Sequence, residues 1–504
     1  MKENYTPIKM IETDYAKLVE PYKEKAIKVL EDLININSVY DESTASRFKP
    51  FGTGVEKALS YVATLGTKLG FRVDRCDNYA TELSYGHGSK VLDIYAHLDV
   101  VPVNKDNWSK DPFKMEIEDG NIYGRGSCDD KGPAVACLFA TKALIDQGKI
   151  LGCKVRFIFG GNEESGSLCL EHYFKVLRKA YPTLGFSPDA DYPLIYAEKS
   201  MLNYVLTYPI ELPFVDPFDA GDALNIVLDT CKVHIRMDKE KLYIIDKAYA
   251  RYKKKYKGLD GEVIKGMLVT QGVAAHGSMP QLGINAGLHM LNFLGEYYDV
   301  DILKFIFECY NDGLGKNMGI SYKDEDFSET TYNVGRITYT GTELKIYVNC
   351  RFPVSVTYSD IISRVHQIAK CPIKVLSTSD GFVFKKDSPL IKNLISAYQE
   401  ETGDLASKPL AIGGGTYARE SKNSVAFGAA FPKRDYRMHG DDEYFPLDDF
   451  YANMQIYANA IDKLTTYLQQ LSNEEDTIKV EIKEGEESSE TKAQKVDKHR
   501  SRRK

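Results

Sequence analysis

Short apolar runs and helical stretches alternate along the first third of the chain. Residues 91–96 (Val-Leu-Asp-Ile-Tyr-Ala) and 154–159 (Lys-Val-Arg-Phe-Ile-Phe) are mostly apolar and predict buried strands. The stretch 133–146 between them is helical in character. A strand, a helix and a strand in this order predict two parallel strands joined by a crossover helix. Ligands bind to such open sheets outside the carboxyl ends of the strands, so candidate chemistry is expected there.

The pattern changes after about residue 200. Before it, helices are predicted over 14–36 and 54–69, followed by a strand at 71–73. Beyond it, the predicted elements are strands within 201–232 and 266–274, a hairpin over 331–352 that turns near Gly341, and helices over 284–297 and 360–369. A helix over 391–402 and an apolar run at 425–427 then indicate a return to the first domain. This mixed order predicts an inserted α+β domain.

These elements predict an α/β fold with a mixed, largely parallel sheet flanked by helices, plus the inserted α+β domain. A chain of 504 residues is too long for one compact core. The first domain is expected to comprise 1–199 and 381–472, and the inserted domain 200–380. Residues 473–504 are rich in glutamate and then in lysine and arginine, with few apolar residues, so a disordered charged tail is expected.

Composition narrows the possible functions. The chain is 43% hydrophobic and 27% charged with a net charge of -7, which is typical of a soluble protein and argues against a specific nucleic-acid partner. The first residues lack a signal-peptide pattern, and no apolar run approaches the ~20 residues that span a bilayer. Nine cysteines are scattered without a Cys-x-x-Cys pair. This predicts reduced thiols, a cytoplasmic location and no structural zinc knuckle.

Imidazole and carboxylate side chains follow the predicted strand ends. His97 and Asp99 end the first run, Asp129 lies in a glycine-rich stretch, and Glu163 and Glu164 follow the second run. Hydrolysis at a two-metal centre needs a bridging carboxylate, which Asp129 suits, and a base that is not a ligand. Of two adjacent glutamates, one can bind metal while the other remains free. Asp99 is placed to accept the second N–H of the His97 ring.

Longer motifs make a resemblance specific. They are 97–102 (His-Leu-Asp-Val-Val-Pro), 124–133 (Gly-Arg-Gly-Ser-Cys-Asp-Asp-Lys-Gly-Pro) and 162–167 (Asn-Glu-Glu-Ser-Gly-Ser). Over roughly residues 15–470 the chain resembles the zinc metallopeptidase family of aminoacylase, carboxypeptidase G and dipeptidases. The stretches 186–193, 413–419 and 438–439 resemble the bacterial dipeptidase V subgroup in particular.

The resemblance implies two divalent cations, most simply Zn²⁺, with Mn²⁺ or Co²⁺ as alternatives. It implies ligands for one cation at His97, Asp129 and Asp189, and for the other at Asp129, Glu164 and His439. Asp191 is a rival for Asp189, and the Ser-Pro-Asp context favours Asp189. Glu163 would be the general base and acid, Asp99 the partner of His97, and the Asp129-Asp130 peptide bond would be cis.

The inserted domain resembles the lid of this family. His276, in Ala-His-Gly-Ser-Met-Pro, would donate to the oxyanion of the reaction, and Asn225 is a further candidate for that contact. Arg351 would bind a substrate carboxylate with its planar donors. Two departures stand out: Cys128 precedes Asp129, and 440–443 (Gly-Asp-Asp-Glu) is unusually acidic, which bears on substrate preference.

The function expected from the resemblance is a metallo-dipeptidase, a monomeric cytoplasmic hydrolase of small peptides. Two alternatives remain at this point. One is an N-acyl amino acid amidohydrolase on the same scaffold, with the same chemistry and a different pocket. The other is a non-enzymatic protein whose basic tail, Lys492–Lys504, binds nucleic acid or anionic surfaces.

Overall fold

The computed structural model describes residues 10–500, without the side chains of 239–240 and 475–500. The chain divides into two compact units. Unit 1 comprises Met1–Tyr196, Phe384–Leu410 and Thr416–Lys504, and unit 2 comprises Ala197–Val383 and Ala411–Gly415. The units thus divide at 196/197 and 383/384, where the sequence predicts boundaries at 199/200 and 380/381.

Unit 1 is built on a mixed sheet, which confirms the predicted fold class. In spatial order its strands are β1 (Arg72–Asp74), β2 (Ala80–Gly86), β6 (Lys154–Gly160), β3 (Val91–His97), β7 (Leu184–Ser187), β20 (Ser424–Ala426) and β9 (Ile195–Glu198). The central strands β6, β3, β7 and β20 pair in parallel, and the flanking strands pair antiparallel. The parallel centre places the carboxyl ends of β3, β6 and β7 at one edge of the sheet.

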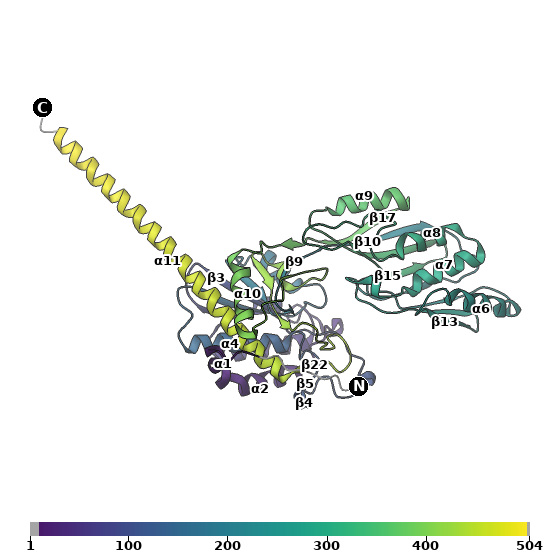
Figure 1. Ribbon diagram of the computed structural model, residues 1–504, viewed down its shortest axis with the longest axis horizontal. Coiled ribbons are helices and arrows are strands. Elements are labelled where there is room, and N and C mark those ends of the chain that lie inside the picture. Colours follow the sequence, from purple (N-terminus) through teal and green to yellow (C-terminus); the bar gives the residue numbers. More distant parts are fainter. Residues whose placement is uncertain (1–9, 501–504) are drawn as a thin grey trace. The chain divides into compact units, whose positions relative to one another are not determined.

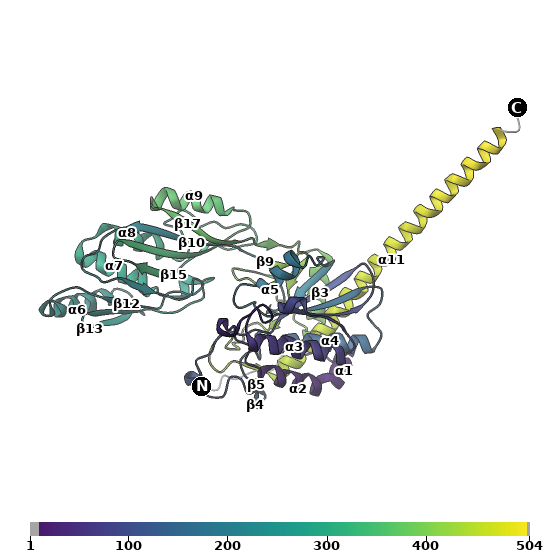
Figure 2. The same cartoon turned by 180° about the vertical axis from the view of Figure 1, so that it is seen from behind.

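Helices cover this sheet because its central strands are apolar on both faces. The crossover helix between β3 and β6 is α4 (Lys131–Asp146), and it packs with α11 (Leu447–Arg500) and β3 (Figure 1). Helix α4 is buried nearly all round, as its apolar composition requires. Helix α3 (Thr53–Lys68) packs against β1 and β2 and is visible in the reverse view (Figure 2).

The predicted helix over 14–36 is wrong in one respect, because it is two helices. Helix α1 (Asp14–Val19) and α2 (Lys23–Ile34) are separated by a 3-10 turn at Glu20–Tyr22. Pro21 lies in that turn, and proline has no N–H to continue an α-helical ladder. Helix α10 (Pro389–Thr402) begins after Ser388, whose Oγ accepts a hydrogen bond from the N–H of Ile391 at 3.4 Å.

Smaller elements complete unit 1. They are α5 (Leu168–Glu171), a three-stranded sheet of β4 (Glu116–Glu118), β5 (Asn121–Tyr123) and β22 (Tyr444–Pro446), and a pair of β8 (Ala190–Asp191) with β21 (Ala429–Ala430). Strand β19 (Leu410–Ile412) pairs with β9. Strand β22 follows His439, and strand β5 precedes the glycine-rich stretch. Their antiparallel pairing therefore holds these two segments together.

Unit 2 is an α+β body with its own apolar core. Its larger sheet is antiparallel, in the order β11 (Phe218–Ala220), β15 (Thr331–Tyr339), β16 (Glu343–Phe352), β10 (Ser200–Pro209) and β17 (Ile373–Ser379). A smaller sheet consists of β12 (Thr230–His234), β14 (Met267–Gln271) and β13 (Asp260–Ile264), and β18 (Phe382–Val383) pairs with 197–198 of β9. The helices are α6 (Lys239–Lys253), α7 (Ala286–Tyr298), α8 (Asp301–Tyr310) and α9 (Tyr358–Ala369).

The predicted hairpin over 331–352 is confirmed as β15 and β16, and Gly341 adopts a φ of 104° in its turn. Helix α6 and strand β13 occupy a stretch for which the sequence predicts no element.

The C-terminal segment continues α11 to Arg500, so its backbone is helical where the sequence predicts a disordered tail. The disorder of 473–504 stays a prediction. Within residues 10–500, none of the helices combines the length and the apolar character that a membrane crossing requires.

Candidate metal centre

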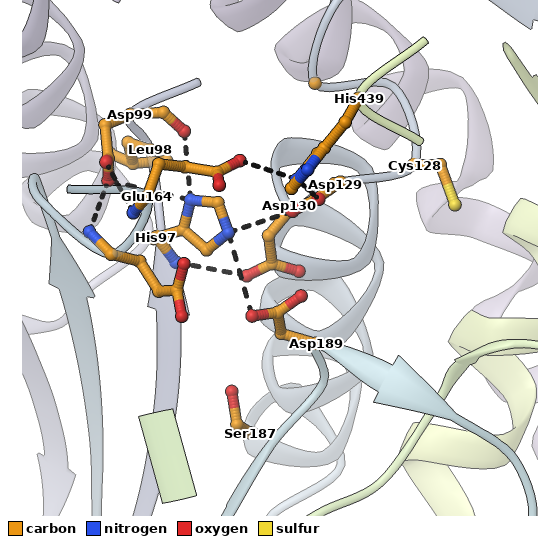
Figure 3. A network of polar contacts seen from close by, with 12 residues as sticks. His97, Leu98, Asp99, Cys128, Asp129, Asp130, Glu164, Ser187, Asp189 and His439 are labelled. Atoms are coloured by element: carbon orange, nitrogen blue, oxygen red, sulfur yellow. Dashed lines mark hydrogen bonds and ion pairs between the residues drawn. The ribbon is translucent and has the colours of Figure 1, made fainter. Parts of the chain in front are cut away.

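His97 ends β3, and the fold fixes both the position and the rotation of its ring. The side chain is completely buried, and His97 pairs with Gly160 at the end of β6. Its main-chain N–H donates to Oδ2 of Asp130 at 3.0 Å. Nδ1 of the ring lies 2.9 Å from the main-chain oxygen of Asp99. The second ring nitrogen, Nε2, is therefore directed toward the neighbouring carboxylates (Figure 3).

Asp129 lies between two histidines. Its Oδ1 is 3.0 Å from Nε2 of His97, and its Oδ2 is 2.8 Å from Nε2 of His439. Oε1 of Glu164 is 3.2 Å from the same nitrogen of His439. Because each oxygen of one carboxylate faces a different imidazole, the arrangement has the form of a bridging ligand with one histidine on either side (Figure 3).

Asp189 approaches the same ring nitrogen of His97 that faces Asp129 (Figure 3). It follows the last residue of β7 by two positions, and its Oδ2 lies 3.7 Å from Nε2 of His97. Asp191, the rival candidate, is an exposed residue of the short strand β8. The structure therefore brings Asp189 to the cluster, as the Ser-Pro-Asp context favours.

The carboxylate of Asp99 has a different set of contacts from the one predicted. Its Oδ1 and Oδ2 accept hydrogen bonds from the N–H groups of Glu163 and Glu164, each at 3.1 Å. Oδ1 is 3.6 Å from Nδ1 of His97, whereas the main-chain oxygen of the same residue is at 2.9 Å. The nearest acceptor of the ring is thus the main-chain carbonyl of Asp99, and its carboxylate holds the two glutamates in place.

Burial and crowding shift the acid–base properties of the cluster. Burial raises the pKa of Glu163 well above its usual value, and raises the pKa of Glu164 as well. Burial and the charge of Asp129 raise the pKa of Asp189 to about 7. Burial also opposes ionisation of Asp129, but His439 and His97 outweigh it and lower its pKa. Hydrogen bonds to Asp129 and Glu164 raise the pKa of His439 to about 11.

The donor set fits divalent cations. Among the described residues, two groups have ligand atoms within 4.8 Å of one another: His97 with Asp129 and Glu164, and His97 with Glu163 and Asp189. Partly buried carboxylates gathered this closely repel one another unless positive charge lies between them. Imidazole and carboxylate ligands suit Zn²⁺, Mn²⁺ and Co²⁺. The two groups contain four of the five predicted ligands together with Glu163, the predicted base. His439, the fifth predicted ligand, belongs to neither group but contacts Asp129 and Glu164.

The glycine-rich stretch that carries Asp129 has a partner in the acidic run 440–443. Glu443 belongs to the acidic run expected to bear on substrate preference, yet its side chain is fully buried. It pairs with the guanidinium of Arg125 at 2.6 Å. Its carboxylate is therefore directed to Arg125, and the bearing of the acidic run on substrate preference stays a prediction. Strand periodicity could have indicated the burial of Glu443, because Phe445, two residues on, is buried as well.

Cys128 is an inert neighbour of this site. Its side chain is 4% exposed, burial raises the pKa of its thiol well above the usual value, and the side chain points away from Asp129 (Figure 3). The next peptide bond, Asp129-Asp130, is cis, as the resemblance implies. All nine cysteines carry free thiols and are buried.

The remaining predicted site residues belong to unit 2. The main-chain oxygen of Asn225 accepts the N–H of Gly277 at 2.6 Å, so the segments of Asn225 and His276 lie side by side. Nδ1 of His276 is 2.6 Å from Oγ of Ser278. The guanidinium of Arg351, on β16, is buried and donates to the main-chain oxygen of Gly413 at 2.7 Å. The roles of Asn225, His276 and Arg351 in binding substrate stay predictions.

Comparison with known proteins agrees with this chemistry. The model of the peptidase family M20/M25/M40 matches residues 94–463. The chain belongs to this family. It is therefore a hydrolase that acts on peptide bonds and binds divalent metal, and the alternative of a purely non-enzymatic protein is set aside.

Relatives match over nearly their full length. A Bacillus subtilis (strain 168) protein with the name "Putative dipeptidase YtjP" is 35% identical over 460 residues, which cover 88% of this chain and 97% of the relative. "Putative dipeptidase SH1171" of Staphylococcus haemolyticus (strain JCSC1435) is 32% identical, with the same coverage.

Solved structures share the fold. Human carnosine dipeptidase 1 matches with a TM-score of 0.57 and 12% identity, over 90% of this chain and 98% of that one. The dipeptidase Dug1p from Saccharomyces cerevisiae matches with a TM-score of 0.56 and 14% identity, again over 90% and 98%. At these identities the likeness concerns the fold alone.

Proposed function

We propose that the protein is a di-zinc dipeptidase that uses Glu163 as its general base. The observation that carries this proposal is the Asp129 carboxylate, whose two oxygens face His97 at 3.0 Å and His439 at 2.8 Å. The names of the most similar relatives, which describe dipeptidases, support the choice of substrate.

Two sets of ligands would hold the cations. His97, Asp129 and Asp189 form one set, and Asp129, Glu164 and His439 form the other. When bound, the cations supply Lewis-acid polarisation of the peptide carbonyl and make a water molecule more acidic. Because the imidazoles and carboxylates must lose their protons to act as ligands, the proposal includes a cation affinity that rises with pH.

Glu163 moves the proton. Its carboxylate lies beside His97 and Asp189, and its main-chain N–H is held by Asp99 at 3.1 Å. Burial raises its pKa, so it accepts a proton more readily than an exposed glutamate. In the proposed reaction Glu163 takes a proton from the attacking water and delivers it to the amine that leaves.

Unit 2 would supply substrate contacts. His276 and Asn225 would donate to the oxyanion, and Arg351 would bind the carboxylate end of the peptide with a pair of parallel hydrogen bonds. We further propose that the chain acts as a monomer in the cytoplasm.

The test is a substrate panel with the purified chain, before and after removal of metal by a chelator. We expect free dipeptides to be cleaved, the activity to vanish on chelation, and added Zn²⁺ to restore it. The same assay is run with N-acyl amino acids as comparison substrates. Faster hydrolysis of these than of dipeptides would overturn the dipeptidase proposal in favour of a deacylase, whereas activity that survives complete chelation would overturn the metal-dependent mechanism.

A further inference from the structure

Glu443 is a fully buried carboxylate beneath the loop that carries Asp129. Its Oε2 accepts hydrogen bonds from Nη1 of Arg125 at 2.6 Å and from the N–H of Gly126 at 3.0 Å. Its Oε1 accepts the N–H groups of Cys128 at 2.9 Å and of Asp129 at 3.1 Å. One side chain thus binds three main-chain amides of the loop, including that of the predicted bridging ligand.

Main-chain and side-chain hydrogen bonds also join this loop to the segment that carries His439. The main-chain oxygen of Glu443 accepts the N–H of Gly124 at 3.1 Å. Nη2 of Arg125 donates to the main-chain oxygen of Gly440 at 2.9 Å. His439 itself has a φ of 61° and a side chain that is 55% exposed, so packing holds it less firmly than the other predicted ligands, whose side chains are at most 19% exposed. These hydrogen bonds therefore link the His439 segment to the Asp129 loop.

We propose that Glu443 is a positioning residue for both cation sites. Its carboxylate sets the main chain of Asp129 directly, and its pairing with Arg125 sets the segment of His439. The inference rests on the proposed function, because it concerns the same five ligands. It adds a residue that is not a ligand and that lies four positions beyond the last of them.

The charge and shape of a carboxylate are what this position requires. A carboxylate offers acceptor sites on both oxygens, and Glu443 uses both oxygens for four donors. In Glu443→Gln one oxygen becomes an amide nitrogen, which donates and cannot accept, so two of the four donors lose their partner. A buried main-chain amide without an acceptor is costly, so these amides would turn toward other acceptors. That change would move the loop and Asp129 with it.

The experiment measures Zn²⁺ binding to the full-length apo-protein by competition with a chromophoric chelator, together with the melting temperature. Residues that orient metal ligands typically change metal affinity by about tenfold to hundredfold. We expect Glu443→Gln to weaken binding of both ions by about this factor at a temperature where circular dichroism shows it folded. Arg125→Lys keeps the charge but not the donor to Gly440, so we expect it to weaken mainly the ion that shares His439.

Asp93→Asn is the matched control. Asp93 is also fully buried, and it pairs with Arg156 of the same sheet through both oxygens, each at 2.6 Å. We expect this variant to lower the melting temperature with Zn²⁺ affinity unchanged.

The outcomes separate this inference from the function on which it rests. If the wild-type protein binds no Zn²⁺, the proposed function fails. If the wild type binds two ions and Glu443→Gln binds them equally well while melting earlier, Glu443 is only structural and the inference fails. Should Glu443→Gln not fold, Arg125→Lys decides: unchanged affinity for both ions would overturn the inference.

Discussion

Asp99→Asn probes how the two glutamates are held. The carboxylate of Asp99 is 1% exposed and accepts the N–H groups of Glu163 and Glu164, each at 3.1 Å. Asparagine has nearly the same shape, but its amide nitrogen must face one of those N–H groups, so one hydrogen bond becomes a contact between two donors. Water cannot replace the lost acceptor in so buried a place.

The expected magnitude follows from that single hydrogen bond. A hydrogen bond to a charged acceptor is worth about 1.5–3 kcal/mol, and ~1.4 kcal/mol corresponds to a factor of ten in rate. Displacement of Glu163, the proposed base, should therefore reduce kcat/KM for a dipeptide by roughly tenfold to hundredfold. Because the main-chain oxygen of Asp99 still faces Nδ1 of His97, ligation by this ring should be preserved.

The assay is steady-state dipeptide hydrolysis combined with metal content per chain after desalting. Asp404→Asn is the control, since Asp404 also accepts two main-chain amides, those of Ala406 and Ser407, each at 3.0 Å, in a loop outside the cluster. We expect full activity from this control. Wild-type kcat/KM in Asp99→Asn would show that the hydrogen bonds to Glu163 and Glu164 have no part in the reaction.

Three further predictions follow from particular residues. His439→Ala should retain one of two Zn²⁺ ions in metal analysis and lose dipeptide hydrolysis; two retained ions would contradict its assignment. Gly132→Ala should lower the melting temperature and the free energy of unfolding, the latter by ~1–3 kcal/mol, because the new Cβ would lie 1.9 Å from the main-chain oxygen of Ser127. An unchanged melting temperature would contradict this prediction. Burial lowers the pKa of His289 to about 4, below the 6.5 of the unfolded chain. As the pH drops, the unfolded state therefore binds a proton before the folded state does. The free energy of unfolding falls between pH 6.5 and pH 4 as a result. Urea unfolding at pH 7 and pH 5 should show a loss of about 2 kcal/mol in the wild type that His289→Gln lacks; an equal loss in both would exclude this histidine as the cause.

Much of the fold could be predicted because local pattern and connectivity agree. The apolar runs of β3 and β6, with a helical stretch between them, leave few topologies other than a parallel pair with its carboxyl ends together. That alone brings His97 near Glu163 and Glu164. Pro21 shows the limit of periodicity, because apolar spacing continues across a point where the backbone cannot donate its hydrogen bond.

The sequence alone could predict which types of residue form the candidate site, but not which residues meet in space. Asp129 and His439 lie 310 positions apart, and their 2.8 Å contact depends on tertiary structure, so only resemblance to a family pairs them in advance. The sequence also cannot distinguish the carboxylate of Asp99 from its main-chain oxygen, though the two have different partners. Glu443 illustrates the same limit in part. Its alternation with Phe445 could have indicated burial, but its pairing with Arg125 depends on tertiary structure.

The most direct test of the central claim is dipeptide hydrolysis by Glu163→Gln measured beside its Zn²⁺ content. We expect two bound ions per chain, as in the wild type, with kcat reduced by about 10²–10⁴-fold because the group that moves the proton is gone. Hydrolysis at the wild-type rate with both ions in place would contradict the role of Glu163, since some other group would then be the base.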